Sequence, residues 1–106
     1  MTAMKKKPNL TRAAILKALR EHEDLLRKYS VKRLGLFGSY ARGRQKRDSD
    51  VDFLVDFERP TYDNFIDLTF SLERLFRRKV GLVTSRSLNP HVKPFVENEV
   101  AWHEVR

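Results

Sequence analysis

Polar and apolar residues alternate along residues 50–57, and this alternation constrains the fold more than any other feature of the sequence. One set of alternate positions is apolar and consists of Val51, Phe53, Val55 and Phe57. The other set carries the acids and consists of Asp50, Asp52, Leu54 and Asp56. Because successive side chains of a strand point to opposite faces, the pattern predicts a half-buried strand with acid on its other face.

The neighbouring segments predict an α/β (α+β) protein, with a small mixed β-sheet and helices packed on it. Apolar residues at helical spacing, and a start at Asn89-Pro90 for the last segment, predict three helices, at 11–29, 62–77 and 87–99. Short apolar runs predict two further strands at 31–37 and 80–84, and an end strand or tail at 100–105. The polar run 43–49 predicts a loop.

The composition limits the chain to a few classes of protein. With 106 residues it is expected to form one domain over 9–106, preceded by a flexible basic tail at 1–8. It contains no cysteine, which excludes a disulfide framework, a thiolate nucleophile and a Cys-ligated zinc site. No run is apolar enough for a signal peptide or a membrane span, so we expect a cytoplasmic protein that does not enter a membrane.

One window combines residues suited to binding metal and phosphate. Gly38-Ser39 closes the strand predicted at 31–37, and ten residues separate Ser39 from Asp50. Asp50 and Asp52 lie about 6.5 Å apart along a strand, and divalent cations such as Mg²⁺ relieve the repulsion between carboxylates placed in this way. Glycine lets the backbone approach a phosphate, to which the Ser39 hydroxyl and the amides after it can bond. The window predicts a phosphoryl or nucleotidyl transfer site.

The polyphosphate of a substrate also needs positive charge. Such charge follows the Gly-Ser turn at Arg42, Arg44, Lys46 and Arg47. Arginine and lysine form strong charge-assisted hydrogen bonds to phosphate oxygens. The three residues of the loop at 44–47 are equally compatible with a solvated surface.

The segment LFGSYARGRQKRDSDVDFLVDF resembles the signature of the minimal nucleotidyltransferases, the MNT branch of the DNA polymerase β-like superfamily. That signature is Gly-Ser, ten residues, then Asp-x-Asp. The resemblance implies a minimal nucleotidyltransferase domain over 9–106, in which Gly38, Ser39 and Arg42 bind the nucleotide and Asp50 and Asp52 ligate Mg²⁺. It further implies that Ser39, Asp50 and Asp52 are catalytic and that ATP is the substrate. Small members of this family commonly act as antitoxins that neutralise a HEPN ribonuclease toxin, in some cases by transferring AMP to a toxin tyrosine.

One position departs from the family pattern. The resemblance places a third acid on the strand after the second main helix, where this chain has Lys79-Val80-Gly81-Leu82-Val83, with Gly81 at the acidic position. Loss of a general base costs about 10² to 10⁴ in rate. The alternative to AMP transfer is therefore a catalytically weakened or inactive antitoxin that masks its toxin by binding. Candidates for a replacement acid are Asp56, Glu97 and a residue of the partner.

The net charge of +8 comes from outside the predicted site. Residues 39–58 contain four basic and five acidic residues, a net −1, which leaves +9 on the rest of the chain, including the corner Arg77-Arg78-Lys79. Because no recognition helix or stacking platform is evident, an acidic partner protein is favoured over nucleic acid. Trp102 is expected either to close the core or to anchor a partner. The three histidines show no metal-ligand spacing.

Overall fold

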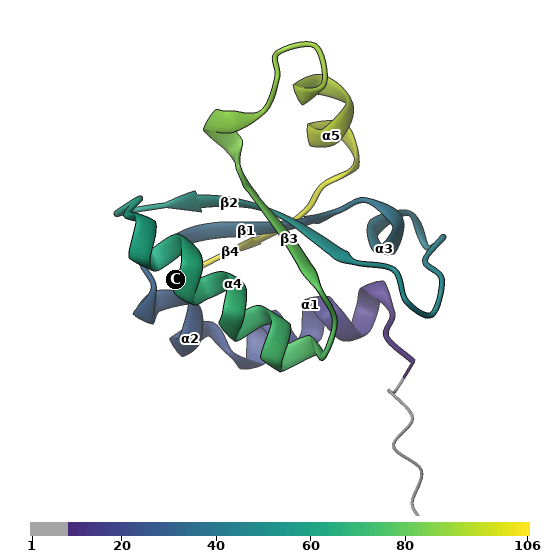
Figure 1. Cartoon of the computed structure of the whole chain (residues 1–106), viewed down its shortest axis with the longest axis horizontal. Helices are drawn as coiled ribbons and strands as arrows, with labels where there is room; N and C mark the ends of the chain where they lie inside the picture. Colours follow the sequence, from purple (N-terminus) through teal and green to yellow (C-terminus); the bar gives the residue numbers. More distant parts are fainter. Residues whose placement is uncertain (1–8) are drawn as a thin grey trace, which may run out of the picture.

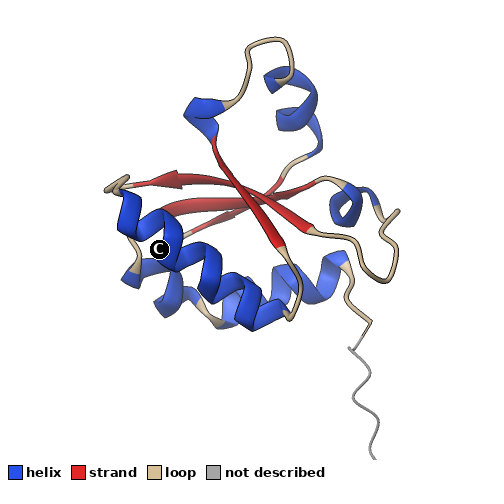
Figure 2. Ribbon diagram, viewed as in Figure 1, coloured by secondary structure: helices blue, strands red, loops and turns tan. Residues whose placement is uncertain are grey.

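A four-stranded mixed sheet forms the centre of the computed structural model, which describes residues 9–106. The strands are β1 (Val31–Phe37), β2 (Val51–Phe57), β3 (Val80–Thr84) and β4 (Ala101–Glu104), in the order β3-β2-β1-β4. β1 is antiparallel to both β2 and β4, whereas β3 runs parallel to β2. The predicted α/β class with a small mixed sheet is confirmed (Figure 2). The tail predicted at 1–8 lies outside the described residues.

Helices cover the two faces of the sheet unequally. Figure 1 shows α1 (Arg12–Glu21), α2 (Glu23–Lys28) and α4 (Tyr62–Phe76) together on one face. The short helix α5 (Lys93–Glu99) stands on the other side of the sheet, preceded by the 3-10 turn η1 (Ser85–Ser87). The single turn α3 (Ser39–Arg42) follows β1 directly. Among residues 9–106, no helix is long and apolar enough to cross a bilayer.

Two predicted helices differ from the structure. The helix expected at 11–29 is broken at His22, whose ring nitrogen and backbone N–H both contact the Ala18 carbonyl, at 2.9 Å each. The apolar stripe continues across this break, so the sequence pattern does not reveal it. The helix expected at 87–99 is confined to Lys93–Glu99, with Pro94 in its first turn, because proline has no N–H to donate and favours a helix start.

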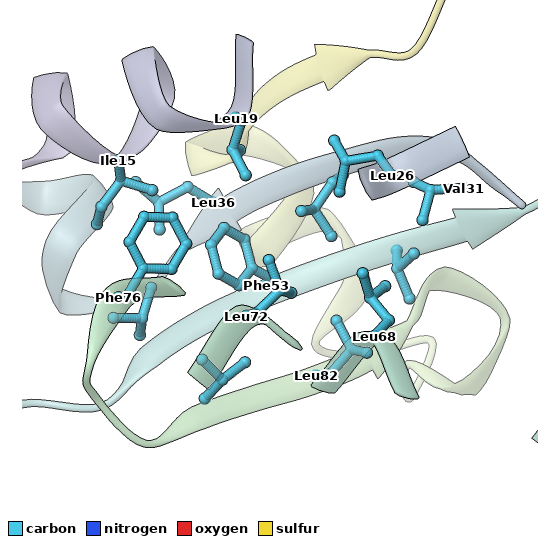
Figure 3. Close-up of a cluster of buried hydrophobic side chains, with 14 of the residues drawn as sticks. Ile15, Leu19, Leu26, Val31, Leu36, Phe53, Leu68, Leu72, Phe76 and Leu82 are labelled. Carbon is cyan, nitrogen blue, oxygen red and sulfur yellow. The ribbon is translucent and has the colours of Figure 1, made fainter. Parts of the chain in front are cut away.

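A single apolar cluster lies between the sheet and the main helices (Figure 3). Its side chains include Ile15, Leu19, Leu26, Val31, Leu36, Phe53, Leu68, Leu72, Phe76 and Leu82. The rings of Phe53 and Phe76 stack obliquely with centroids 5.9 Å apart. Tyr40 of α3 is 1% exposed and belongs to the same cluster, so the turn that follows β1 is anchored in the core.

The second face of β2 is less open than the sequence predicts. Leu54 lies between Asp52 and Asp56 on this face but is fully buried. Beside it, a Cβ built on Gly35 would meet the ring of Trp102 at 2.8 Å. The guanidinium of Arg33 lies 3.8 Å from the centre of that ring. Trp102 therefore packs on the second face of the sheet, where cation–π contact with Arg33 stabilises it.

Candidate active site

The turn after β1 has a backbone that only glycine adopts readily. Gly38 has φ of +79° and ψ of −155°, and Ser39 begins α3. The carbonyl of Gly38 accepts the N–H of Arg42 at 3.1 Å, which closes the turn. Gly43, at φ +70°, ends it in the left-handed conformation. The hydroxyl of Ser39 makes no hydrogen bond to any other residue of the described chain, so it is available to a ligand.

Asp52 occupies the space that two glycines leave open. It pairs with Phe37 of β1 and with Gly81 of β3. A Cβ on Gly38 would collide with Oδ2 of Asp52, and a Cβ on Gly81 would lie 2.7 Å from its Oδ1. The Gly-Ser turn and the acidic strand, separated by ten residues in the sequence, are therefore in direct contact at this point.

The charges around Asp52 act on one another. Asp50 is exposed and lies just before the first residue of β2, so only Asp52 is within the strand. Burial raises the pKa of the Asp52 carboxyl above its usual 3.8, the charge of Asp50 raises it further, and the charge of Arg42 acts in the opposite direction. The structure thus brings Asp50, Asp52 and Arg42 into one electrostatic group beside Gly38.

This group has the chemistry of a partial site for Mg²⁺. Two carboxylates that repel each other are hard oxygen ligands, and a divalent cation between them removes the repulsion. Among residues 9–106 no set of three or more acidic, histidine or cysteine side chains converges on one point. Mg²⁺ typically takes one or two protein carboxylates and completes its shell with phosphate oxygens and water. Asp50 and Asp52 fit that arrangement.

Glu99 is the site residue that the sequence reasoning missed. Its carboxylate accepts two hydrogen bonds from Nη1 of Arg42, at 3.0 and 3.1 Å, and one from the backbone N–H of Gly38, at 3.2 Å. Val96, three residues earlier on α5, is buried, and this helical phase turns Glu99 inward with it. In the sequence, Glu99 differs from Glu97 only in its spacing of three residues from the apolar Val96, which places Glu99 and Val96 on the same face of the helix.

Neither residue suggested as a replacement acid is part of this group. Asp56 is bound to Arg33, with Nε and Oδ2 2.6 Å apart. Glu97 is exposed on α5. Gly81, in contrast, pairs with Asp52 across the parallel strands β2 and β3. Its φ lies outside the left-handed region, so the strand does not require glycine, but the Asp52 carboxylate fills the space beside it.

The basic residues of the loop are not among the charges that act on Asp52. Arg44, Lys46 and Arg47 are exposed. Lys46 and Arg47 line a surface pocket of about 320 Å³ together with Tyr40 and residues before α1. The corner at 77–79 is only partly a charged surface, because Arg78 is 7% exposed and donates to the carbonyls of Phe76 and Arg77.

The fold and the site together define a class, a nucleotidyl-transfer domain reduced to a small mixed sheet and its helices. The model of the family described as "Nucleotidyltransferase domain" matches residues 16–103. The chain therefore belongs to the nucleotidyltransferase domain family, and it is a minimal member of it.

Relatives and solved structures agree with this assignment. The chain is 43% identical over 95 residues to "Protein adenylyltransferase MntA" of Thermococcus cleftensis, covering 88% of this chain and 96% of that protein. It is 39% identical over 97 residues to "Putative protein adenylyltransferase MJ1379" of Methanocaldococcus jannaschii, covering 87% and 97%. Both relatives match almost their whole length, so the chain is homologous to protein adenylyltransferases of the MntA type.

Two solved structures share the fold. One is described as a "putative minimal nucleotidyltransferase" and superposes with a TM-score of 0.74 at 34% identity, covering 88% of this chain and 96% of that one. The other is a toxin–antitoxin crystal structure with AMP-PNP, with a TM-score of 0.65 at 27% identity over 88% of this chain and 72% of that chain. The predicted nucleotidyltransferase fold is confirmed.

Proposed function

We propose that this chain is an MNT-type antitoxin that transfers AMP from ATP to a tyrosine hydroxyl of a HEPN-family toxin. The observation that carries the proposal is the position of Asp52, which contacts the Gly38 turn and lies in one electrostatic group with Asp50 and Arg42. The homology to protein adenylyltransferases supports the reaction, and the toxin–antitoxin structure with AMP-PNP supports the substrate and the kind of partner.

Each residue has a part in this reaction. Gly38 offers its backbone N–H and an open approach to the phosphates, and Ser39 offers a hydroxyl beside it. Arg42 neutralises phosphate charge. Asp50 and Asp52 would hold Mg²⁺, which when bound neutralises the charge that builds up on the leaving pyrophosphate.

The step itself is an in-line substitution. The tyrosine oxygen forms a bond to the α phosphorus, the bond from that phosphorus to the bridging α–β oxygen breaks, and pyrophosphate leaves. The hydroxyl proton passes to water or to a residue of the toxin, since Gly81 offers no carboxylate beside Asp52 to accept it. The roles of this chain are to orient the triphosphate and to hold the charges that favour the transition state.

A second candidate function follows from Gly81. An antitoxin that has lost the third acid can still neutralise its toxin by covering the toxin's active site. The exposed positive charge outside the site suits an acidic partner surface in either case, because complementary charge steers association.

Intact mass spectrometry of the toxin produced together with this chain separates the two functions. AMP transfer predicts a toxin heavier by one or more AMP units. The mass of the toxin should not increase when it is produced with the variant of this chain that carries Asp50→Asn and Asp52→Asn. An unmodified toxin that is nevertheless inhibited in the complex contradicts AMP transfer and supports masking. Steep salt dependence of RNA or duplex binding by the isolated chain would instead support a nucleic-acid role.

A further inference from the structure

The carboxylate of Glu99 occupies the donors that the proposed function assigns to phosphate. Its Oε1 accepts the Gly38 N–H at 3.2 Å, and both of its oxygens accept from Nη1 of Arg42. The inference below rests on the proposed function, because it concerns access to that site. We propose that Glu99 is a built-in competitor of the nucleotide, and that the triphosphate binds the Gly38 turn only when the Glu99 carboxylate has left it.

Glu99 and a phosphate would compete for one backbone donor. Gly38 has one N–H, and the Glu99 oxygen lies directly on it. A phosphate oxygen that accepts the same N–H must take the place of that carboxylate oxygen. If both anions stayed, two like charges would meet at one donor, next to a third and a fourth negative charge on Asp50 and Asp52. Such crowding strongly disfavours a shared site.

Glu99 also weakens the attraction of Arg42 for phosphate. While its guanidinium is paired with Glu99, its charge is already partly neutralised, so it attracts a phosphate less. Its charge also acts on Asp52. Release of Glu99 therefore frees both the Gly38 donor and the arginine in one event.

The contact between Glu99 and Arg42 is partly exposed to water. The side chain of Glu99 is 29% exposed and that of Arg42 is 49% exposed. Ion pairs that are exposed to water to this extent contribute little free energy, so this one is readily broken. Glu99 is the last residue of α5, and Val96 is the only residue of that helix that is buried. Rotation of the Glu99 side chain toward water is therefore sufficient, and no change of the sheet is needed.

The test compares two matched variants of the same short helix. Glu99→Gln keeps the size and an acceptor for Gly38 but removes the charge, and Glu97→Gln removes an equal charge from an exposed position. Calorimetric titration of the folded proteins with Mg-ATP, and with tripolyphosphate plus Mg²⁺, gives the affinities. We expect Glu99→Gln to bind both anions about two- to fivefold more tightly than wild type, with Glu97→Gln unchanged.

Three outcomes would overturn the competitor role. Weaker binding by Glu99→Gln would mean that Glu99 positions Arg42 for the phosphates. Equal tightening in both variants would mean that only the net charge of the protein matters. If Mg-ATP binds no variant but tripolyphosphate binds Glu99→Gln more tightly, the competitor role stands and the proposed ATP-dependent function fails. If neither anion binds any variant, both fail.

A measurement on the unmodified protein tests independently whether the anion displaces the Glu99 carboxylate. With ¹³C-labelled glutamate, the side-chain carboxyl resonance of Glu99 reports its hydrogen bonds. Saturation with tripolyphosphate and Mg²⁺ is expected to move this resonance to the position of a hydrated carboxylate, while the Glu97 resonance stays in place. A Glu99 resonance that does not move while the anion binds would contradict the displacement.

Discussion

Gly81 faces Asp52 across the parallel pair of strands β2 and β3, and Oδ1 of Asp52 lies where a side chain at position 81 would begin, 2.7 Å from a Cβ built there. The backbone of Gly81 does not require glycine, and the atoms nearest to a Cβ built there belong to the end of the Asp52 side chain, which can shift to make room. An acid at this position would stand beside Asp52 on the same face of the sheet.

An acid at position 81 is expected to increase the rate of AMP transfer. Gly81→Asp should increase the rate of AMP transfer to the toxin at least about tenfold over wild type, because a general base contributes about 10² to 10⁴ in rate. The control is Gly81→Asn, which introduces the same volume without the charge. A rate for Gly81→Asp that does not exceed that of Gly81→Asn would show that no acid at this position assists the reaction.

Gly81→Asp and Gly81→Asn are also expected to differ in thermal stability. Without Mg²⁺, a carboxylate at 81 repels Asp52, and we expect Gly81→Asp to have a lower Tm than Gly81→Asn. Addition of Mg²⁺ should raise the Tm of Gly81→Asp more than that of wild type, since a ligand that binds only the folded state stabilises it. Equal Mg²⁺ responses in thermal melts would argue against a metal site between these residues.

Removing the two acids is expected to abolish metal-dependent nucleotide binding. Asp50→Asn with Asp52→Asn should weaken Mg-ATP binding by more than about tenfold in calorimetry. Because burial raises the pKa of Asp52, its ionised form disfavours the folded state above that pKa. The double variant should therefore be at least as resistant to urea as wild type near pH 7. Unchanged Mg-ATP affinity would contradict the assignment of these residues.

Acid stability is expected to depend on Asp56. Burial acts to raise its pKa, but the nearby Ser85 hydroxyl and the positive charges of Arg33 and Lys32 outweigh burial, so the pKa lies below its usual 3.8. A lowered folded pKa means that ionised Asp56 stabilises the fold above the unfolded value, and that this contribution is lost as the pH falls through the folded value.

Asp56→Asn should therefore destabilise the protein by about 0.5 to 1 kcal/mol near pH 6 and by less near pH 3. Urea unfolding at the two pH values measures the difference. The control is Asp67→Asn, at an exposed position of α4, whose effect should be small at both pH values. A constant cost of Asp56→Asn across this range would disprove the linkage.

The packing of β4 on β1 predicts a steric effect at Gly35. In Gly35→Ala, the new Cβ would collide with Val100 and with the ring of Trp102. Overpacking of this kind costs about 1 to 3 kcal/mol. The fluorescence of Trp102, the only tryptophan, follows unfolding directly. Gly43→Asn is the control, because Gly43 has open space around it and asparagine tolerates its left-handed backbone. Its cost should be clearly smaller.

The strands were predictable because their signal is local. The bounds expected at 31–37 and 80–84 agree with β1 and β3, and the alternation at 50–57 identified β2 to within one residue. β2 begins at Val51, whose N–H bonds to the Lys79 carbonyl, and that partner is set by the pairing with β3. The break at His22 was missed because the apolar stripe on either side of it is continuous.

By itself the sequence determined the individual strands, the Gly-Ser turn and the two acids at the start of the neighbouring strand, because each depends on residues close together in the chain. Tertiary structure decided which distant residues complete the site. Strand register placed Gly81 against Asp52, and the phase of α5 turned Glu99, rather than Glu97, toward Gly38 and Arg42. Register and helix phase are set by packing across the whole sheet, so no local pattern reveals that the donors of the proposed phosphate site already hold a carboxylate.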